Sequence, residues 1–379
     1  MSSYPISCFE EWREEFFTQT RNSHEDLEFL DTLETVCFDE EVWNKANNQP
    51  EEIFSLQKYF EILTSDTQIV NGTEKLNSES KTFGTIGDFG LPVSREVLAA
   101  IWGVETRYGE IKGEHPVLDA LATLAATNTR RRDFFEQNLI SALKILQDGI
   151  VRPDQFKGSW AGAMGHTQFM PSIYLEYGID VRQRGKVDIW GDDPLDALAS
   201  TANYLHKHDW AEYLPVLSEV SVPPRFDFMK LNNGHESTVS NWQTQGIEFV
   251  NKEVPLNANA EIISPAGKDG PKFALFCNFK SILAYNPSRS YALAVGYLAN
   301  CLTGKQTLVS GWPSTETYLT RSELKKIQSY LVDRGYDTGG IDGLTGSKTI
   351  KSIQHYQQSR GWIPDGFPDR ELYQAVVSD

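Results

Sequence analysis

One stretch of the chain combines a clear helical pattern with an acid in an unusual place. In residues 94–109 the apolar side chains recur at helical spacing and form one stripe, made of Val97, Leu98, Ile101, Val104 and Tyr108. Glu105 falls inside this stripe, four residues after Ile101. Ser94 is suited to cap the first turn, and Gly109 is suited to end the helix. The pattern predicts a helix with one carboxyl group on its apolar face.

A carboxyl group in this position has two interpretations. Burial disfavours the ionised form of an acid, and an acid that stays protonated near neutral pH can give a proton to a leaving-group oxygen. A Glu on an apolar face can also pair with an Arg or satisfy nearby backbone groups, because structural ion pairs perturb pKa values as well. The helix alone leaves both open for Glu105, which we expect to be at least partly buried.

The overall composition narrows the class of protein. The chain has 379 residues, is 40% hydrophobic and carries a formal net charge of −17. These values are typical of a soluble globular protein of about two or three domains. The acidic charge argues against nucleic acid and against a polybasic membrane anchor, since both need a basic surface. No apolar run approaches the roughly 18 to 20 residues of a membrane helix.

The N-terminus and the cysteines bear on the cellular compartment. The first five residues contain neither a charged nor an apolar signal region, which indicates a cytosolic start or a leader that has been removed. The cysteines are Cys8, Cys37, Cys277 and Cys301, and they lack metal-ligand spacing. They allow a disulfide within each sequence-local pair, or they are four buried thiols, and we favour the second interpretation.

A second informative stretch covers residues 158–172. Glycines interrupt regular structure there or allow close backbone approach, at Gly158, Gly162 and Gly165. The uncharged hydrogen-bonding side chains of the stretch are Ser159, His166, Thr167, Gln168 and Ser172. Trp160, Phe169 and Met170 supply apolar surface. Such a mixture suits a sugar, which offers hydroxyls at its edge and C–H groups on its faces. It also suits a tightly packed turn without a ligand, which composition alone favours.

Residues 180–193 resemble a calcium loop whose ligand positions have been changed. An EF-hand loop places oxygen ligands at positions one, three and five, and Gly at six. Counted from Asp180, the sequence has Arg182 at three, Arg184 at five and Gly185 at six. Two arginines in place of carboxylates would oppose a cation. We therefore expect no calcium here, and ion pairs from both arginines to nearby acids.

Other segments set out the organisation of the chain. Residues 1 to 70 predict short amphipathic helices, and 211–280 predicts a small β-rich insertion, with apolar runs between turn-rich segments. Residues 313–319 indicate a linker, and 320–379 an independent unit of three helices with Gly/Asp turns. The main domain accordingly covers 1–312. Three consecutive arginines at 130–132 either cap helix ends and pair with acids or line a groove.

Several stretches taken together resemble the membrane-bound lytic murein transglycosylase B family. The matching segments are 100–109, 118–124, 158–172, 188–190, 196–205 and 285–292. Several motifs in the right order are far more specific than one of them, and the resemblance covers roughly residues 5 to 310. The C-terminal unit resembles the three-helix peptidoglycan-binding domain through 335–336, 340–346, 356–357 and 365–366.

The resemblance implies a fold, a reaction and a set of residues. The implied fold is mainly α, of the α+β kind: a lysozyme-like helical catalytic domain with an added helical domain and a small β-rich insertion. The implied reaction cleaves the β-1,4 bond between N-acetylmuramic acid and N-acetylglucosamine and leaves a 1,6-anhydromuramoyl end. Glu105 matches the family's single catalytic acid/base, and no metal or cofactor is needed. The implied substrate-binding residues are Ser159, Gln168, Met170, Arg130, Arg131, Tyr204, Tyr285, Asn286 and Tyr291.

The resemblance also implies partners and a location. Peptidoglycan strands are the expected partner, cell-wall synthesis enzymes are further candidates, and a monomer is expected. The implied location is the periplasm, with the leader removed, either in solution or associated with the outer membrane. Two alternatives stay open: a hydrolytic muramidase of the same fold, which uses water and a second acid, and a wall-binding protein without catalysis.

Overall fold

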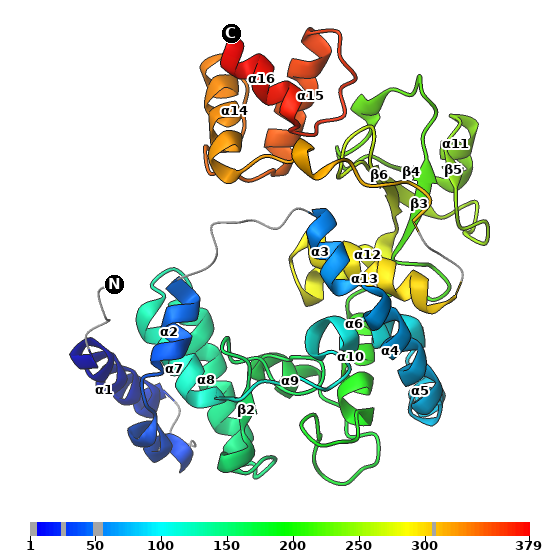
Figure 1. The fold of residues 1–379 in the computed structure, drawn as a ribbon. Helices are drawn as coiled ribbons and strands as arrows, with labels where there is room; N and C mark the ends of the chain where they lie inside the picture. The colour runs from blue at the N-terminus through cyan, green and yellow to red at the C-terminus, as the bar shows by residue number, and fades with distance from the viewer. Residues whose placement is uncertain (1–5, 24–27, 48–55, 305–307) are drawn as a thin grey trace. The chain divides into compact units, whose positions relative to one another are not determined.

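A computed structural model of the chain describes residues 6–23, 28–47, 56–304 and 308–379 (Figure 1). The described residues within 1–49 and 70–207 form one compact unit (unit 1), and those within 50–69 and 208–379 form another (unit 2). The expected mainly helical fold is confirmed, although parts of the helical region predicted at 1–70 lie outside the described residues. No helix in the described ranges has both the length and the apolar character needed to cross a bilayer.

Unit 1 is built from helices, with one short strand pair. Its helices are α1 (Ile6–Ser23), η1 (Glu28–Thr35), α2 (Glu40–Asn47), most of α4 (Asp66–Ser78), α5 (Ser80–Asp88), α6 (Arg95–Thr106), α7 (Val117–Thr127), α8 (Arg132–Gln147), η2 (Pro153–Gln155), α9 (Pro171–Tyr177) and α10 (Leu195–Lys207). Strands β1 (His115–Pro116) and β2 (Lys157–Gly158) pair antiparallel. Helix α7 packs against α1, α2 and α8, and α10 packs against α5, α6 and α9.

Helix α6 is the predicted acid-bearing helix, and it lies in the core of unit 1. It spans Arg95–Thr106, and Ser94 is its N-cap residue in an extended conformation. Every residue from Val97 to Gly103 is buried. Small side chains permit this burial on all sides, because Ala99 and Ala100 let neighbouring elements approach and are themselves 0% exposed.

Unit 2 contains the predicted β-rich insertion as a five-stranded antiparallel sheet (green in Figure 1). The strand order is β4 (Glu236–Thr238), β6 (Asn259–Ile263), β7 (Lys272–Leu275), β3 (Leu217–Ser221) and β5 (Glu248–Phe249). Around the sheet lie α3 (Leu56–Leu63), η3 (Phe228–Lys230), α11 (Val239–Thr244), α12 (Cys277–Tyr285) and α13 (Arg289–Leu302). Trp242 of α11 is fully buried in the core of the insertion, and its indole donates to the Ala260 carbonyl at 2.9 Å.

The C-terminal part of unit 2 is a small helical bundle with its own apolar core. Its elements are η4 (Thr315–Thr317), α14 (Arg321–Asp333), α15 (Ser347–Ser359) and α16 (Arg370–Ser378), drawn in orange and red in Figure 1. The buried core residues are Ile327, Leu331, Ile353, Tyr356, Leu372 and Val376. Helix α14 begins with a capping box, in which Thr320 and Glu323 satisfy each other's backbone N–H groups.

Buried polar groups join this bundle to the β-rich insertion. The side chain of Gln354 is 1% exposed and donates to the carbonyls of Phe228 and Leu231, both at 3.1 Å. Asp365 is 4% exposed and accepts from the backbone N–H of Lys268 at 2.8 Å. The bundle therefore shares buried hydrogen bonds with the insertion, in addition to the covalent connection.

The connecting segment is itself bonded to the sheet. Glu219 of β3 is 1% exposed, and its two carboxylate oxygens accept from the backbone N–H groups of Val309 and Ser310, each at 2.8 Å. The Tyr297 hydroxyl accepts from the Leu308 N–H at 3.1 Å. Trp312 contacts Phe60 edge to face, with ring centroids 5.2 Å apart. These contacts give the segment a defined path over unit 2.

The cysteines differ from both earlier interpretations. All four are free, so neither sequence-local disulfide is present. Cys301 is buried, whereas Cys8, Cys37 and Cys277 are exposed, so the expectation of four buried thiols is wrong for three of them. For Cys8 the reason is local: the neighbouring Phe9 and Trp12 form the buried face of α1 and leave the thiol on the solvent side.

The buried bonds of Gln354 yield a test of the contact between bundle and insertion. We expect Gln354→Ala to lower the free energy of unfolding of unit 2 by about 1–3 kcal/mol, because two carbonyl groups lose a buried donor. The exposed Gln358 on the same helix is the matched control, and Gln358→Ala should change stability by about 0.5 kcal/mol or less. Denaturant unfolding of the full chain measures both. Equal stability of the two variants would contradict the assigned contact.

Candidate active site

Glu105 lies in the last turn of α6, where the helix ends abruptly. It is half-buried, as the sequence predicts. The three residues Arg107, Tyr108 and Gly109 have φ values of 50°, 61° and 88°, all in the left-handed region. Left-handed backbone is costly for residues other than glycine and is stored where the surrounding structure enforces it. The chain thus turns away directly after Glu105, and the acid lies at the edge of a buried helix.

Tyr108 shows what enforces this turn. Its side chain is 3% exposed and packs back on α6, with its ring edge to face against Trp102 at a centroid distance of 5.8 Å. A Cβ at Gly103 would lie 2.5 Å from the Tyr108 ring, so only glycine at 103 leaves room. Burial raises the pKa of the Tyr108 hydroxyl well above its ordinary value. The aromatic ring therefore anchors the residues that follow Glu105.

The loop at 158–170 is a tight turn whose shape depends on Ser159 and glycine. Ser159 Oγ accepts from the Ala163 N–H at 3.1 Å, and the Ser159 N–H donates to the Ala163 carbonyl at 2.8 Å. Gly162 has a φ of 82°, and a Cβ there would lie 2.4 Å from Leu121. Ser159 remains half-buried. The packed turn predicted from composition is therefore present, and it holds Ser159 in one conformation.

Gln168 fastens this loop to the segment that follows Glu105. Its amide nitrogen donates to the carbonyls of Lys112 at 3.1 Å and Gly165 at 2.9 Å. Its backbone φ is 54°, again left-handed in a residue other than glycine. Gly113 makes a second close contact, because a Cβ there would lie 2.1 Å from the Gly158 carbonyl oxygen. The amide nitrogen is used internally, which orients the amide oxygen of Gln168 as an acceptor.

Two polar residues of the loop are structural groups inside the protein. His166 and Thr167 are 3% and 1% exposed. The Trp102 indole N–H donates to His166 Nδ1 at 3.1 Å, so the ring proton lies on Nε2, which donates to the Gly191 carbonyl at 2.7 Å. Burial lowers the pKa of His166 to about 4. The sequence predicts a hydrogen-bonding role for His166 but not these partners, because only the tertiary structure brings them together.

Lys112 also binds the segment at 188–191, which contacts His166. Its ammonium donates to the carbonyls of Trp190 at 2.7 Å and Gly191 at 3.0 Å. Burial lowers its pKa, whereas Asp192 and Asp188 oppose that change. Asp188 in turn accepts from the Gly191 N–H at 2.9 Å. Segment 188–191 is thereby bonded to the chain that follows Glu105.

The predicted ion pairs of Arg182 and Arg184 are confirmed. Arg184 pairs with Asp196 at 3.0 Å, and Arg182 pairs with Asp193. Asp196 is 1% exposed and also accepts from the N–H groups of Val181 and Asp188, at 3.2 and 3.0 Å. A guanidinium thus supplies the positive charge that neutralises the buried Asp196.

The remaining predicted binding residues lie in different surroundings. Arg130 and Arg131 are exposed, and the Arg131 guanidinium lies over the Phe134 ring at 4.4 Å. Arg132 donates to the Ala125 carbonyl at 3.2 Å, so this arginine caps the end of α7, one of the two roles expected for the three arginines. Met170 is half-buried and is the N-cap residue of α9.

The predicted tyrosines and Asn286 fall into two groups. Tyr204 belongs to unit 1, is 6% exposed, and packs against Tyr177 with ring centroids 4.8 Å apart. Burial raises its pKa to about 12. Tyr285, Asn286 and Tyr291 belong to unit 2, at the junction of α12 and α13. Tyr291 is 3% exposed, and Asn286 accepts from the Ser288 N–H at 3.1 Å.

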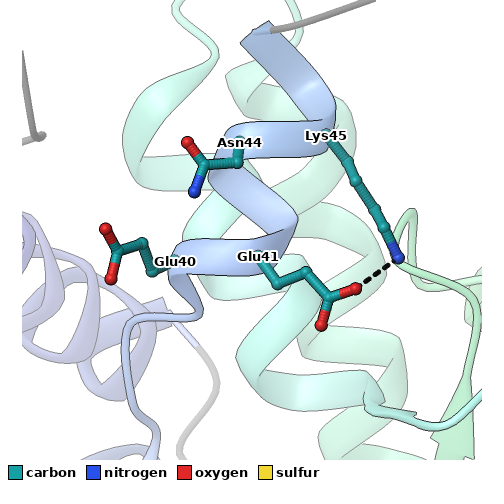
Figure 2. A pocket seen from close by; sticks show the side chains of 4 residues that line it. All are labelled: Glu40, Glu41, Asn44 and Lys45. Atoms are coloured by element: carbon teal, nitrogen blue, oxygen red, sulfur yellow. Dashed lines mark ion pairs between the residues drawn. The ribbon is translucent and has the colours of Figure 1, made fainter. Parts of the chain in front are cut away.

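A surface hollow on α2 contains none of the predicted residues. Figure 2 shows Glu40, Glu41, Asn44 and Lys45 around it, and Lys45 pairs with Glu41 at 2.7 Å. The four residues project from the solvent-exposed face of one helix, where water screens an ion pair and leaves it little effect on stability. The hollow has no feature of a catalytic centre.

Within unit 1 the structure therefore places the end of α6, which bears Glu105, beside the loop that bears Ser159 and Gln168, through the bonds from Thr106 to His166 and from Gln168 to Lys112. Comparisons with known proteins identify the family. Residues 8–300 match the family described as transglycosylase SLT domain, and the chain belongs to this family. Residues 320–376 match the putative peptidoglycan binding domain.

Individual relatives place the chain more closely. It is 34% identical over 217 residues to membrane-bound lytic murein transglycosylase B of Escherichia coli K12, a match that covers 56% of this chain and 58% of that protein. The solved structure of SltB3 from Pseudomonas aeruginosa with NAG-anhNAM-pentapeptide is 38% identical with a TM-score of 0.90, over 97% of this chain and 99% of that one. Escherichia coli Slt35 in complex with calcium is 27% identical with a TM-score of 0.65, over 77% and 92%.

The calcium in that relative raises the question of whether this chain could hold the ion. Calcium takes about six to eight oxygen ligands. In the part of the chain that the structure describes, no group of three or more acidic, His or Cys side chains is placed to hold a metal. Asp180 Oδ1 is buried without a hydrogen-bond partner, but it is a single oxygen. Arg184 already occupies the Asp196 carboxylate, so the residues do not fit calcium.

The two arginine pairs give a matched test. We expect Arg184→Met to lower the free energy of unfolding more than Arg182→Met does, because the buried Asp196 loses its counter-charge. Arg182→Met removes a pair whose two side chains are 46% and 41% exposed, and should cost about 0–1 kcal/mol. Denaturant unfolding with added calcium or EDTA measures both variants and the wild type. Stabilisation of the wild type by calcium, or equal losses in the variants, would contradict the assignment.

The lowered pKa of His166 predicts a pH dependence of stability. The unfolded chain binds a proton below about pH 6.5, whereas folded His166 stays neutral to about pH 4. The stability that this group contributes is therefore present above pH 6.5 and is lost as pH falls to about 4, by about 3 kcal/mol.

His166→Gln lacks this titration, so its stability relative to wild type should rise by that amount between pH 7 and pH 4, as measured by denaturant unfolding. The exposed His206 supplies the control His206→Gln, which should track the wild type. A difference between wild type and His166→Gln that is independent of pH would show that His166 does not titrate as stated.

Proposed function

We propose that this protein is a peptidoglycan lytic transglycosylase that cleaves the β-1,4 bond between N-acetylmuramic acid and N-acetylglucosamine and leaves a 1,6-anhydromuramoyl end. The family match supports the class of reaction. The relative that covers nearly the whole chain is in complex with NAG-anhNAM-pentapeptide, which contains an anhydromuramoyl group. The observation that carries the assignment of the acid is the position of half-buried Glu105 at the end of buried α6.

The mechanism follows from the use of one acid. Ordinary glycosidases employ two carboxyl groups. Here protonated Glu105 gives its proton to the glycosidic oxygen, and the bond from that oxygen to muramoyl C1 breaks. The muramoyl 6-hydroxyl then attacks C1, and the Glu105 carboxylate takes the hydroxyl proton. The acid returns to its starting state, and the substrate supplies its own nucleophile, so atoms and protons balance without metal or cofactor.

The loops around Glu105 supply the binding groups of the proposal. We propose that Ser159 and Gln168 contact the muramoyl sugar. Ser159 is held in one conformation by its bond to Ala163, and Gln168 by its bonds to Lys112 and Gly165. Further contacts to the glycan are proposed for Met170, Arg130, Arg131, Tyr204, Tyr285, Asn286 and Tyr291. The bundle at the C-terminus would bind the same polymer, which raises the local concentration of substrate for an enzyme that acts on an insoluble wall.

The biological setting follows from the substrate. Peptidoglycan occupies the wall compartment, so we propose that the protein acts in the periplasm as a monomer, in cell-wall remodelling and turnover. Association with the outer membrane and contacts with cell-wall synthesis enzymes are part of the same proposal.

Replacing the acid tests the function directly. We expect Glu105→Gln to lower the rate of glycan cleavage by about 100- to 10,000-fold, because the amide can neither give nor take the proton. Glu110 is exposed and five residues further on, so Glu110→Gln is the matched control and should retain wild-type activity. Mass spectrometry of digested sacculi identifies the products.

The product spectrum separates the alternatives. Anhydro ends from the wild type and their loss in Glu105→Gln support the proposal. Reducing ends would instead identify a hydrolytic muramidase. Binding to sacculi with no cleavage by the wild type would identify a wall-binding protein, and wild-type rates in Glu105→Gln would show that another group is the acid.

A further inference from the structure

A buried histidine joins the two ends of the segment that bears Glu105. His166 contacts Trp102, three residues before Glu105, through the bond from the indole N–H to Nδ1 at 3.1 Å. Its carbonyl accepts from the hydroxyl of Thr106, the residue after Glu105, at 2.6 Å. The last turn of α6 is thus bonded to one residue on both sides of the acid.

The turn that follows Glu105 is packed on the same ring. Gly109 has a φ of 88°, and a Cβ at this position would lie 2.6 Å from His166 Nδ1. The Gly109 N–H donates to Thr106 Oγ1 at 3.0 Å, so one hydroxyl links the turn and the His166 carbonyl. The left-handed turn that follows α6 therefore packs directly against the imidazole of His166.

The opposite edge of the ring is bonded to a third segment. His166 Nε2 donates to the Gly191 carbonyl at 2.7 Å, and the His166 N–H donates to the Ile189 carbonyl at 3.1 Å. Segment 188–191 is also held by Lys112. The histidine connects α6, the loop that bears Ser159 and Gln168, and segment 188–191.

We propose that His166 is a positioning residue, which holds Glu105 at the orientation needed for proton transfer while it bonds the end of α6 to the substrate-binding loop. This inference rests on the proposed function of Glu105. It assigns His166 no contact with the glycan. The two bonds of the ring have a fixed polarity, since the indole can only donate and the Gly191 carbonyl can only accept.

Because of this polarity, protonation of His166 would disturb the position of Glu105. A proton on Nδ1 would face the Trp102 N–H, and the bond between them would break. The other charged groups that act on the ring are Lys112 and Lys75, which oppose protonation, and Asp188, which favours it. Burial lowers the pKa of His166 to about 4, so we expect the bond to Trp102 to be lost as pH falls through about that value.

The substitutions His166→Asn and His166→Gln each retain one of the two side-chain hydrogen bonds of the histidine. Asn places an oxygen near Nδ1 and can still accept from Trp102, whereas Gln places an amide N–H near Nε2 and can still donate to Gly191. Trp102→Phe removes the indole N–H but keeps an aromatic ring at position 102 and the imidazole of His166. Proton transfer is sensitive to displacements of about 1 Å, so we expect all three variants to lower kcat by about 10- to 100-fold and to leave KM within about threefold.

The experiment measures kcat and KM on soluble glycan strands from pH 3.5 to 8, with full-length protein and a thermal melt for each variant. The wild type should lose kcat as pH falls through about 4. His166→Asn and His166→Gln should lack this limb, because they have no imidazole to protonate. Trp102→Phe should shift the limb to higher pH, because Nδ1 is then open to a proton. Exposed His206→Gln serves as the control and should match the wild type.

The outcomes are distinct. Wild-type kcat in folded His166→Asn and His166→Gln, a change in KM alone, or an acid limb that persists in these variants would overturn the inference. If the histidine variants do not fold, Trp102→Phe decides, and wild-type kcat with an unshifted limb overturns it. Glu105→Gln separates the two proposals: an active Glu105→Gln refutes the proposed acid, whereas an inactive one beside fully active His166 variants refutes the positioning role alone.

Discussion

The burial of α6 is the constraint on which the arrangement around Glu105 depends. A helix packed on all sides has no solvated face for a carboxyl group, and burial of an ionised acid is costly unless it is paired. The chain meets this constraint by placing Glu105 in the last turn and by ending the helix one residue later. The three left-handed residues that follow redirect the chain, and Tyr108 and His166 hold them in place.

Local patterns predicted much of this arrangement. The spacing of apolar residues at 94–109 predicted the helix and the half-buried acid, and the structure contains both. The charges at Arg182 and Arg184 predicted ion pairs, because two cations close to several acids in one loop need counter-charges. The apolar runs between turn-rich segments at 211–280 predicted the sheet. In each case neighbours in sequence determine the outcome.

The features that sequence analysis missed depend on partners far apart in the chain. His166 is bonded to Trp102, 64 residues away, and no local pattern gives that pairing. The cysteines illustrate the same limit, because exposure of Cys8 and Cys277 is decided by which helix faces pack. The bonds from Gln354 and Asp365 to the insertion likewise join segments over 90 residues apart, and no local pattern at 320–379 predicts them.

The bonds to the Glu219 carboxylate restrict the motion of the segment that connects the sheet to the C-terminal bundle. A flexible linker would let a wall-binding module adopt many orientations, and the length of the linker would set the distance that the module can reach. Here the backbone of Val309 and Ser310 is bonded to β3, and the bundle is bonded to the insertion. These bonds restrict the motion of the bundle. Tension applied by an anchored glycan strand would then pass into the sheet as a load, and would not be absorbed by the uncoiling of a slack connector.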